Sequence, residues 1–324
     1  TIFSIVLLLI FFPASGFLSQ LINYPHLEMI YWAIIGSIFI EIYSYSYLVL
    51  SSRHQFLQLS LLGILQALIK LISFGVIIWF FSSNLLSITA FYYLAPAVAV
   101  LIISFFLKEK IFYKPKIASY KIRAEMNKFW FHSGVGVAMM TLIGNLDILL
   151  IQRFLNSFET GVYAGAARIA AFMATLSGSI GIVLISRVSR YKNRADIIKY
   201  LKKSSILVLA AIVGFVLYLP FSSLLIKYTI GPEYLSGNLA TIFLVGNSFL
   251  GLILVPLTAV FYTLNKPSYF SINGFIQVAC ILIGTLLFIG QYGIMAAAIS
   301  RIAATILSIG YSLLSVYLVL KKDK

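Results

Sequence analysis

Long apolar runs follow one another along the chain, separated by short polar clusters and by Pro or Gly. Within each run, aliphatic residues are mixed with Gly, Ala and Ser and do not alternate with polar residues, which favours helices over the strands of a membrane barrel. A helix needs about 20 apolar residues to cross the hydrocarbon core. The pattern therefore predicts an all-α integral membrane protein with ten transmembrane helices. The predicted spans are 1–22, 27–51, 57–82, 85–107, 129–154, 159–186, 204–229, 237–264, 268–290 and 293–320.

The composition excludes an ordinary soluble domain. Of the 324 residues, 61% are hydrophobic and only 10% are charged, whereas a soluble domain has about half apolar and about a quarter charged residues. The formal net charge is +15. Proteins that bind nucleic acid carry such charge on a water-facing fold with a normal polar fraction. We therefore expect membrane lipids as partners, and no nucleic acid.

Most of the basic residues fall in alternate loops between the predicted spans. The basic loops are at Arg53, 108–128, 187–203, Lys266 and 321–324. The intervening loops hold only Arg153 and Lys227. Because cytoplasmic loops carry the excess of Lys and Arg, the pattern predicts that both ends of this chain are cytoplasmic and that odd-numbered spans run outward.

Weak internal similarity relates the two parts of the chain. Pro13 and Pro220 have the same separation as Pro25 and Pro232, and these residues lie in the first and seventh spans and the turns after them. Further along, Gly63-Ile-Leu-Gln66 in the third span matches Gly274-Phe-Ile-Gln277 in the ninth. Each match relates a span to the one six later, which is typical of a transporter built from two six-helix halves.

This repeat predicts the domain organisation. An N-terminal lobe at 1–107 has four of six helices, a basic cytoplasmic linker covers 108–128, and a C-terminal lobe of six helices covers 129–324. We therefore expect the chain to be a fragment of a twelve-helix protein that lacks about two N-terminal helices; Thr1 also begins inside an apolar stretch. The linker anchors the protein on an anionic leaflet, or it also docks a partner or gates a cavity.

Ionisable side chains within the spans are candidates for function, because at depth they are costly and face a bundle interior or an aqueous cavity. Glu41 in the second span and Lys70 in the third lie at similar depth, so they form an ion pair or line a cavity. Asp147 in the fifth span and Arg168 in the sixth also lie at similar depths and could pair. Arg301 lies in the last span among small residues, and it either snorkels outward or faces the cavity. Three bases against two acids give a mildly positive cavity, which suits an anionic substrate.

Other chemistry is not indicated. The one cysteine, Cys280, excludes a disulfide framework, and the three histidines, His26, His54 and His132, have no metal-ligand spacing. There is no phosphate-binding loop of the ATPase kind. The predicted outer loops are too short to carry the catalytic residues of a glycan polymerase or ligase. We therefore expect no catalytic residues, no metal and no cofactor.

Several segments together resemble one family. Asn145-Leu-Asp147, followed by Gly161-Val-Tyr163-Ala-Gly-Ala-Ala-Arg168, resembles the "D, then G-x-Y-x-x-A-x-R" passage of the Wzx-type polysaccharide or O-antigen-unit flippases. These belong to the multidrug/oligosaccharidyl-lipid/polysaccharide exporter superfamily. Gly231-Pro-Glu233-Tyr234 is similar to the family's "G-x-E-Y" outer turn, and the segment 292–298 is similar to its closing helix, with Ala296 where the family has Gly.

The resemblance implies a two-lobed secondary transporter of the bacterial inner membrane. It would carry polyprenyl-pyrophosphate-linked oligosaccharide units of O-antigen, capsule or exopolysaccharide from the cytoplasmic to the outer leaflet, by rocking one lobe against the other. The resemblance then implies that lipid-linked oligosaccharide is the substrate and that a proton or a sodium ion is the coupling ion. It also implies glycan polymerase machinery as a candidate partner. Arg168, Lys70 and Arg301 would hold the pyrophosphate or acidic sugars. Asp147 and Glu41 would position those bases or carry a coupling proton, and Asn145 would lie with them in the cavity.

Two other functions stay open. A multidrug or cation antiporter of the same superfamily would be expected to present surplus carboxylate in its cavity. The second open function is that of a lipid II flippase. Such a flippase would need fourteen helices, so the inferred twelve count against it.

Overall fold

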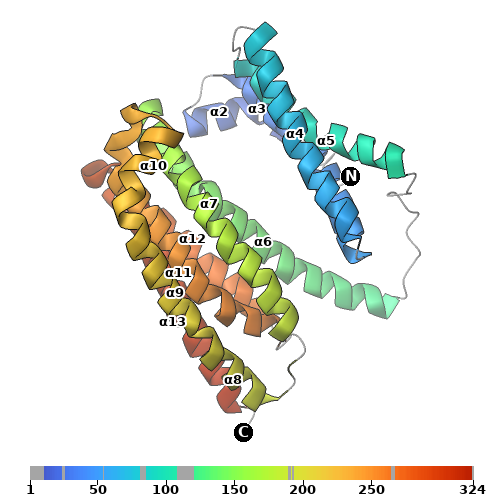
Figure 1. The fold of residues 1–324 in the computed structure, drawn as a ribbon, viewed down its shortest axis with the longest axis vertical. Helices are drawn as coiled ribbons and strands as arrows, with labels where there is room; N and C mark the ends of the chain where they lie inside the picture. Colours follow the sequence, from blue (N-terminus) through green and yellow to red (C-terminus); the bar gives the residue numbers. More distant parts are fainter. Residues whose placement is uncertain are drawn as a thin grey trace. The chain divides into compact units, whose positions relative to one another are not determined.

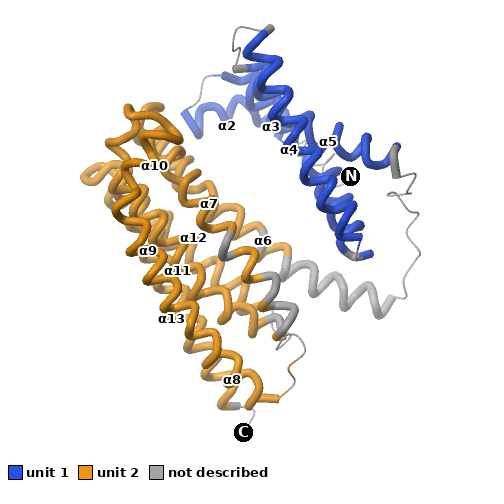
Figure 2. Tube along the Cα trace, viewed as in Figure 1, with its two compact units in different colours: residues 1–117 blue, residues 118–324 orange. Residues whose placement is uncertain are grey.

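The computed structural model describes residues 11–23, 26–53, 55–80, 85–107, 120–188, 191, 193–263 and 267–322. The chain divides into two compact units, Thr1–Ile117 and Ala118–Lys324; they are drawn in blue and orange in Figure 2. Each unit is described by itself. The regular structure of the described residues is helical throughout.

Unit 1 consists of four described helices. They are α2 (Ser15–Ile22), α3 (Leu27–Ser52), α4 (Phe56–Phe80) and α5 (Leu85–Leu107). Helix α5 packs against both α3 and α4, around a core that includes Leu50, Leu62 and Val100. Gly36 permits the approach of α3 to α5, because a Cβ atom there would lie 2.3 Å from the Tyr93 ring.

Unit 2 contains the remaining elements, and Figure 1 shows its long helices lying alongside one another. They are α6 (Tyr120–Phe154), α7 (Ser157–Val188), α8 (Arg194–Ser204), α9 (Ile206–Tyr218), η1 (Leu219–Phe221), α10 (Ser222–Thr229), η2 (Pro232–Gly237), α11 (Asn238–Thr263), α12 (Pro267–Tyr292) and α13 (Ile294–Lys322). Helix α11 packs against α7 and α13, and α12 packs against α13 and α6. Helix α8 and the end of α13 lie at one end of this unit, and α10 lies at the other.

The packing is that of a membrane bundle, apolar on the outside and partly polar within. Trp79 is 83% exposed and Phe172 is 72% exposed, whereas Asp147, Asn273 and Ser308 are fully buried. Eight helical segments of the described residues are long and apolar enough to cross a membrane. The protein is therefore a multi-pass helical membrane protein, as the hydrophobic pattern predicted.

The helices depart from the predicted spans in three places. Pro220 interrupts the predicted seventh span, which is divided into α9, η1 and α10, because proline lacks an N–H and clashes with the preceding helical turn. The fifth span is part of a longer helix that begins at Tyr120, inside the expected linker. Residues 1–10 of the first span lie outside the described residues, and its described part is the short helix α2.

Candidate functional site

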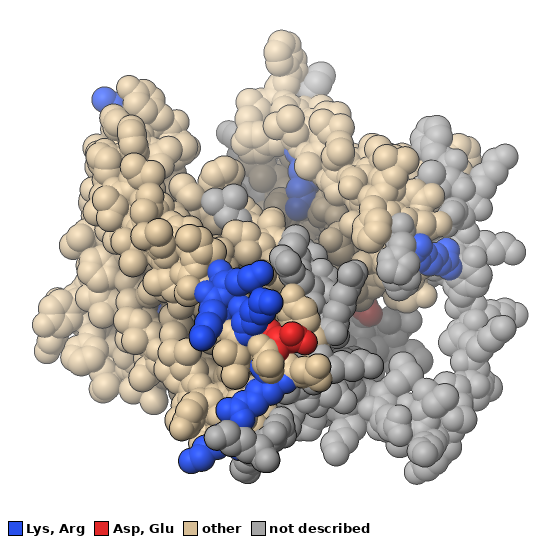
Figure 3. Space-filling view, turned by 60° about the horizontal axis from the view of Figure 1, so that its bottom comes forward, with Lys and Arg blue, Asp and Glu red and all other residues tan. Residues whose placement is uncertain are grey.

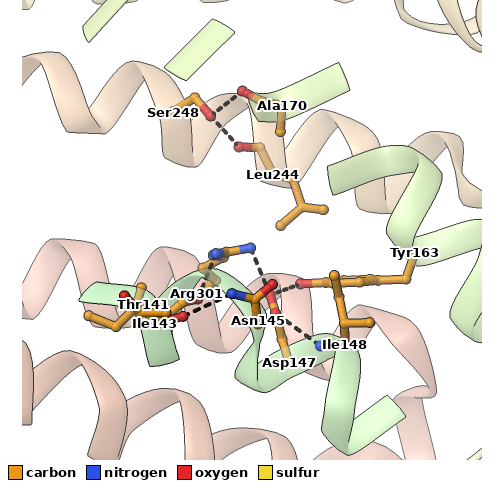
Figure 4. Close-up of polar contacts among 10 residues, drawn as sticks. All are labelled: Thr141, Ile143, Asn145, Asp147, Ile148, Tyr163, Ala170, Leu244, Ser248 and Arg301. Atoms are coloured by element: carbon orange, nitrogen blue, oxygen red, sulfur yellow. Dashed lines mark hydrogen bonds and ion pairs between the residues drawn. The ribbon is translucent and has the colours of Figure 1, made fainter. Parts of the chain in front are cut away.

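Asp147 of α6 is the centre of a buried polar cluster in unit 2. Its side chain is fully buried, and its Oδ2 accepts hydrogen bonds from the Tyr163 hydroxyl at 2.6 Å and from Arg301 Nη1 at 2.8 Å. Figure 4 shows both side chains pointing toward this carboxylate. The cluster therefore joins α6 to α7 and to α13. We call these three residues the Asp147 cluster.

Arg301 is held at two points. While Nη1 binds Asp147, Nη2 donates to the backbone oxygen of Ile143 at 2.6 Å. A carboxylate buried without a partner is strongly unfavourable, and an opposite charge with further hydrogen bonds offsets that cost. The two contacts also fix the direction of the planar guanidinium, which carries five N–H donors. The Arg301 side chain is 15% exposed.

Small residues bring α13 close enough for this contact. Ala297, Ala298 and Ala304 are fully buried, and such residues let membrane helices approach closely. On the neighbouring helix α12, a Cβ atom at Gly284 would lie 2.5 Å from the Ser300 hydroxyl oxygen. The residue next to Arg301 is therefore packed directly against a glycine.

A cavity of about 350 Å³ lies beside the cluster, within unit 2. Arg301 lines it together with the polar side chains of Asn247, Ser248, Gln277 and Thr305. Alanines of α7 and glycines of α6 and α11 form much of the remaining wall, so the short side chains leave the space open. The buried Oδ1 of Asn247 has no hydrogen-bond partner among the described residues.

A chain of polar side chains leads away from the cavity between α12 and α13. Gln277 donates to the Ser308 hydroxyl at 3.0 Å, and Ser308 donates to Asn273 Oδ1 at 2.5 Å. All three are buried. Buried polar groups in a membrane protein are costly unless they are paired, and here each has a partner.

The structure brings together two of the six predicted site residues, Asp147 and Arg301. The pairing of Asp147 with Arg168, which the sequence left open, is not formed, because Asp147 pairs with Arg301 and Arg168 is exposed. Helical geometry explains the difference. Tyr163 faces Asp147, and Arg168 follows Tyr163 by five positions, which turns it about 140° around α7. Arg301 also turns inward, and does not snorkel toward the surface as one alternative held.

Asn145 lies on the same helix as Asp147 but outside the cluster. It is two residues earlier, which places it about 160° away around α6. Its amide donates to the Thr141 backbone oxygen at 3.0 Å, and the residue is exposed. The prediction that it shares a cavity with Asp147 has no contact to support it among the described residues.

Lys70 and Glu41 belong to unit 1. The Lys70 ammonium lies 3.9 Å from the centre of the Tyr92 ring, so it contacts an aromatic face of α5; the sequence had left open an ion pair with Glu41 or a role in a cavity. A cation over an aromatic ring is attracted to the negative face of the ring. Glu41 is half-buried on α3.

Sequence reasoning missed several residues of the site. Tyr163 belongs to a family motif, and its place sixteen residues after Asp147, across one turn between two spans, is a further signal that the sequence contains. Gln277 was noticed only as part of the internal repeat. Asn247 and Thr305 are polar residues in apolar spans, and such positions could have been added to the candidates. The described residues hold no group of three or more His, Cys, Asp or Glu placed to bind a metal ion.

Unit 2 is therefore a helical membrane bundle with a buried ion pair inside it, and comparisons with known proteins place the chain in a family. A family model described as "Polysaccharide biosynthesis protein" matches residues 1–238. The chain belongs to this family, and the resemblance to the polysaccharide branch of the exporter superfamily is confirmed. Among solved structures, the chain is similar to one titled "Lipid II flippase MurJ, inward closed conformation", with a TM-score of 0.79 and 16% identity. The match covers 97% of this chain and 70% of that one, and it shows a shared exporter fold. No curated protein matches.

Proposed function

We propose that the protein translocates polyprenyl-pyrophosphate-linked oligosaccharide units from the cytoplasmic to the outer leaflet, for O-antigen, capsule or exopolysaccharide. The observation that carries this proposal is the guanidinium of Arg301, held inside an apolar bundle beside a cavity whose wall includes four further polar side chains. A sugar headgroup is too polar to cross hydrocarbon unaided, so it needs such a lining. Membership of a polysaccharide biosynthesis family supports this substrate class. The proposed activity is transport and not catalysis.

In this proposal, Arg301 contacts phosphate or acidic sugar oxygens with the N–H groups that Asp147 and Ile143 leave available. Hydrogen bonds between a guanidinium and such oxygens are charge-assisted and strong. Asp147 is then a positioning residue that keeps Arg301 aimed at the cavity. Because Arg301 offsets the charge of Asp147, this carboxylate is a poor site for an organic cation, which favours the flippase over a cation antiporter.

The other predicted residues have supporting roles. Arg168 is exposed on α7, and we infer that it and Lys70 contact the anionic headgroup at a different stage from Arg301. Glu41 is the better candidate for proton or sodium coupling, since the charge of Asp147 is already offset by Arg301. Alternating access by the two lobes and docking with glycan polymerase machinery complete the proposal.

The test is polysaccharide export by the full-length protein in cells that lack their own copy. Arg301→Gln removes the charge but keeps some hydrogen-bonding capacity. We expect export to be roughly 10- to 100-fold slower, because that factor corresponds to the free energy of a hydrogen bond to a charged group. Lys227→Gln is the matched control, because Lys227 is exposed on α10. Normal export by Arg301→Gln at a normal protein level would show that the cavity beside Arg301 does not bind the transported substrate.

A lipid II flippase is the second candidate, because the similar solved structure carries that title. Expression in cells depleted of their own lipid II flippase separates the two functions. Rescue of growth there, without restored surface polysaccharide in the export-deficient cells, would favour this second candidate.

A further inference from the structure

The short helix α8 has one buried face and one strongly basic face. Ile197, Tyr200 and Ser204 are buried, and the first two belong to a core cluster with residues of α11 and α13. Lys199, Lys202 and Lys203 are exposed. Figure 3, which turns the α8 end of unit 2 toward the viewer, shows Lys and Arg gathered on this face beside a small acidic area.

A cavity of about 330 Å³ lies beside α8. Its polar lining is formed by Lys199, Lys203, Tyr191, Tyr200 and Asp196. The two lysines are four positions apart and so lie on the same side of the helix. Tyr200 is fixed by a hydrogen bond from its hydroxyl to the Pro256 backbone oxygen at 3.4 Å, so this wall is anchored to α11.

Apart from the small side chain of Ser204, the rest of the cavity wall is apolar. It is formed by Ile180 and Leu184 of α7 and by Ile206 and Leu207 at the start of α9. Helix α9 has no charged residue, whereas α8 has four basic residues and one acidic residue. The cavity therefore spans the point where the chain passes from a charged, water-facing helix into an apolar, membrane-spanning one. A suitable ligand has a negatively charged group at one end and an apolar part at the other.

We propose that this cavity binds the headgroup of an anionic phospholipid from the surrounding leaflet. Its phosphate lies between Lys199 and Lys203, and its glycerol and first acyl carbons lie against Leu184 and Leu207. With two lysines and the single carboxylate of Asp196, the lining carries one net positive charge, which complements a lipid of net charge −1. The apolar wall favours a lipid phosphate over free phosphate. The site is separate from the cavity beside Arg301.

The test is native mass spectrometry of the full-length protein in detergent with phosphatidylglycerol or phosphatidylcholine of the same acyl chains. We expect tighter binding of phosphatidylglycerol. The double variant Lys199→Gln/Lys203→Gln should bind it about 10- to 30-fold more weakly, since each basic residue contributes to attraction by an anionic headgroup. The double variant Lys199→Arg/Lys203→Arg keeps both positive charges and should bind phosphatidylglycerol as tightly as the unaltered protein. The matched control Lys202→Gln/Lys321→Gln removes the same charge from exposed positions outside the cavity lining and should leave binding unchanged.

Four results would overturn the proposal. They are equal binding of the two lipids, equal loss in both Gln double variants, displacement of phosphatidylglycerol by excess inorganic phosphate, and displacement by low concentrations of polyprenyl pyrophosphate. The last would identify the cavity as a site for the transported lipid. A thermal unfolding curve for each variant separates loss of binding from loss of folding.

Discussion

At the scale of single residues, the charge on Asp147 sets the requirements of the site. A carboxylate in this position, with no exposed surface, needs partners, and it finds a guanidinium from α13 and a hydroxyl from α7. The same contacts explain why Arg301 does not turn toward the membrane surface. Two residues that would each destabilise an apolar bundle therefore stabilise one another.

A double-mutant cycle tests this interdependence. Asp147→Asn or Arg301→Gln alone leaves the other charge buried without its partner, and each should lower the free energy of unfolding by about 3 kcal/mol. The double variant leaves no charge and should lose clearly less than the sum, with a coupling energy of about 1 to 3 kcal/mol. Thermal or denaturant unfolding in detergent measures all four proteins. Additive losses would show that the two side chains act independently.

At the scale of helices, close packing of α12 on α13 holds Arg301 in place. A Cβ atom added at Gly284 would lie 2.5 Å from the Ser300 hydroxyl oxygen. A Cβ atom added at Gly290, on the same helix, would have no neighbouring atom within 4 Å. The two glycines therefore form a matched pair for substitution, one at a helix contact and one in open space.

We expect Gly284→Ala to destabilise the protein by roughly 1 to 3 kcal/mol, as overpacking does. Gly290→Ala should be neutral or stabilising by up to about 1 kcal/mol, because alanine favours helix. The apparent melting temperature in detergent checks both. If the two variants unfold alike, the contact does not determine the helix spacing.

The helices themselves follow from the sequence better than their contacts do. Runs of apolar residues predicted the positions of α3, α4, α5, α11, α12 and α13 within a few residues, because burial in lipid requires such runs. Asp147 and Arg301 could also be chosen, since charge in a span is rare. Their pairing could not, because it depends on how α13 packs against α6. Similar depth alone favoured Arg168, which the rotation of α7 turns away.

At the scale of the whole molecule, the arrangement of charge in unit 2 predicts its orientation in the membrane. Helix α8, which holds four basic residues, lies at the same end as the last turn of α13, and α10 with Lys227 lies at the opposite end (Figure 1). The positive-inside rule therefore predicts that the α8 end faces the cytoplasm.

Cysteine labelling in intact cells checks this orientation. In a Cys280→Ala background, a cysteine at Tyr228, which is 79% exposed, should react with a membrane-impermeant maleimide added outside. A cysteine at exposed Lys202 should react only after the membrane is permeabilised. The reverse pattern would invert the predicted topology.

The central claim, that the protein moves a lipid-linked oligosaccharide with the help of Arg301, is tested most directly by translocation in vesicles. The full-length protein is reconstituted with a fluorescently labelled polyprenyl-pyrophosphate oligosaccharide, and the fraction that becomes accessible in the opposite leaflet is followed over time. Our account predicts protein-dependent translocation that Arg301→Gln slows by roughly 10- to 100-fold and Lys227→Gln leaves unchanged. Translocation no faster than in protein-free vesicles, or equal rates for the wild type and Arg301→Gln, would contradict it.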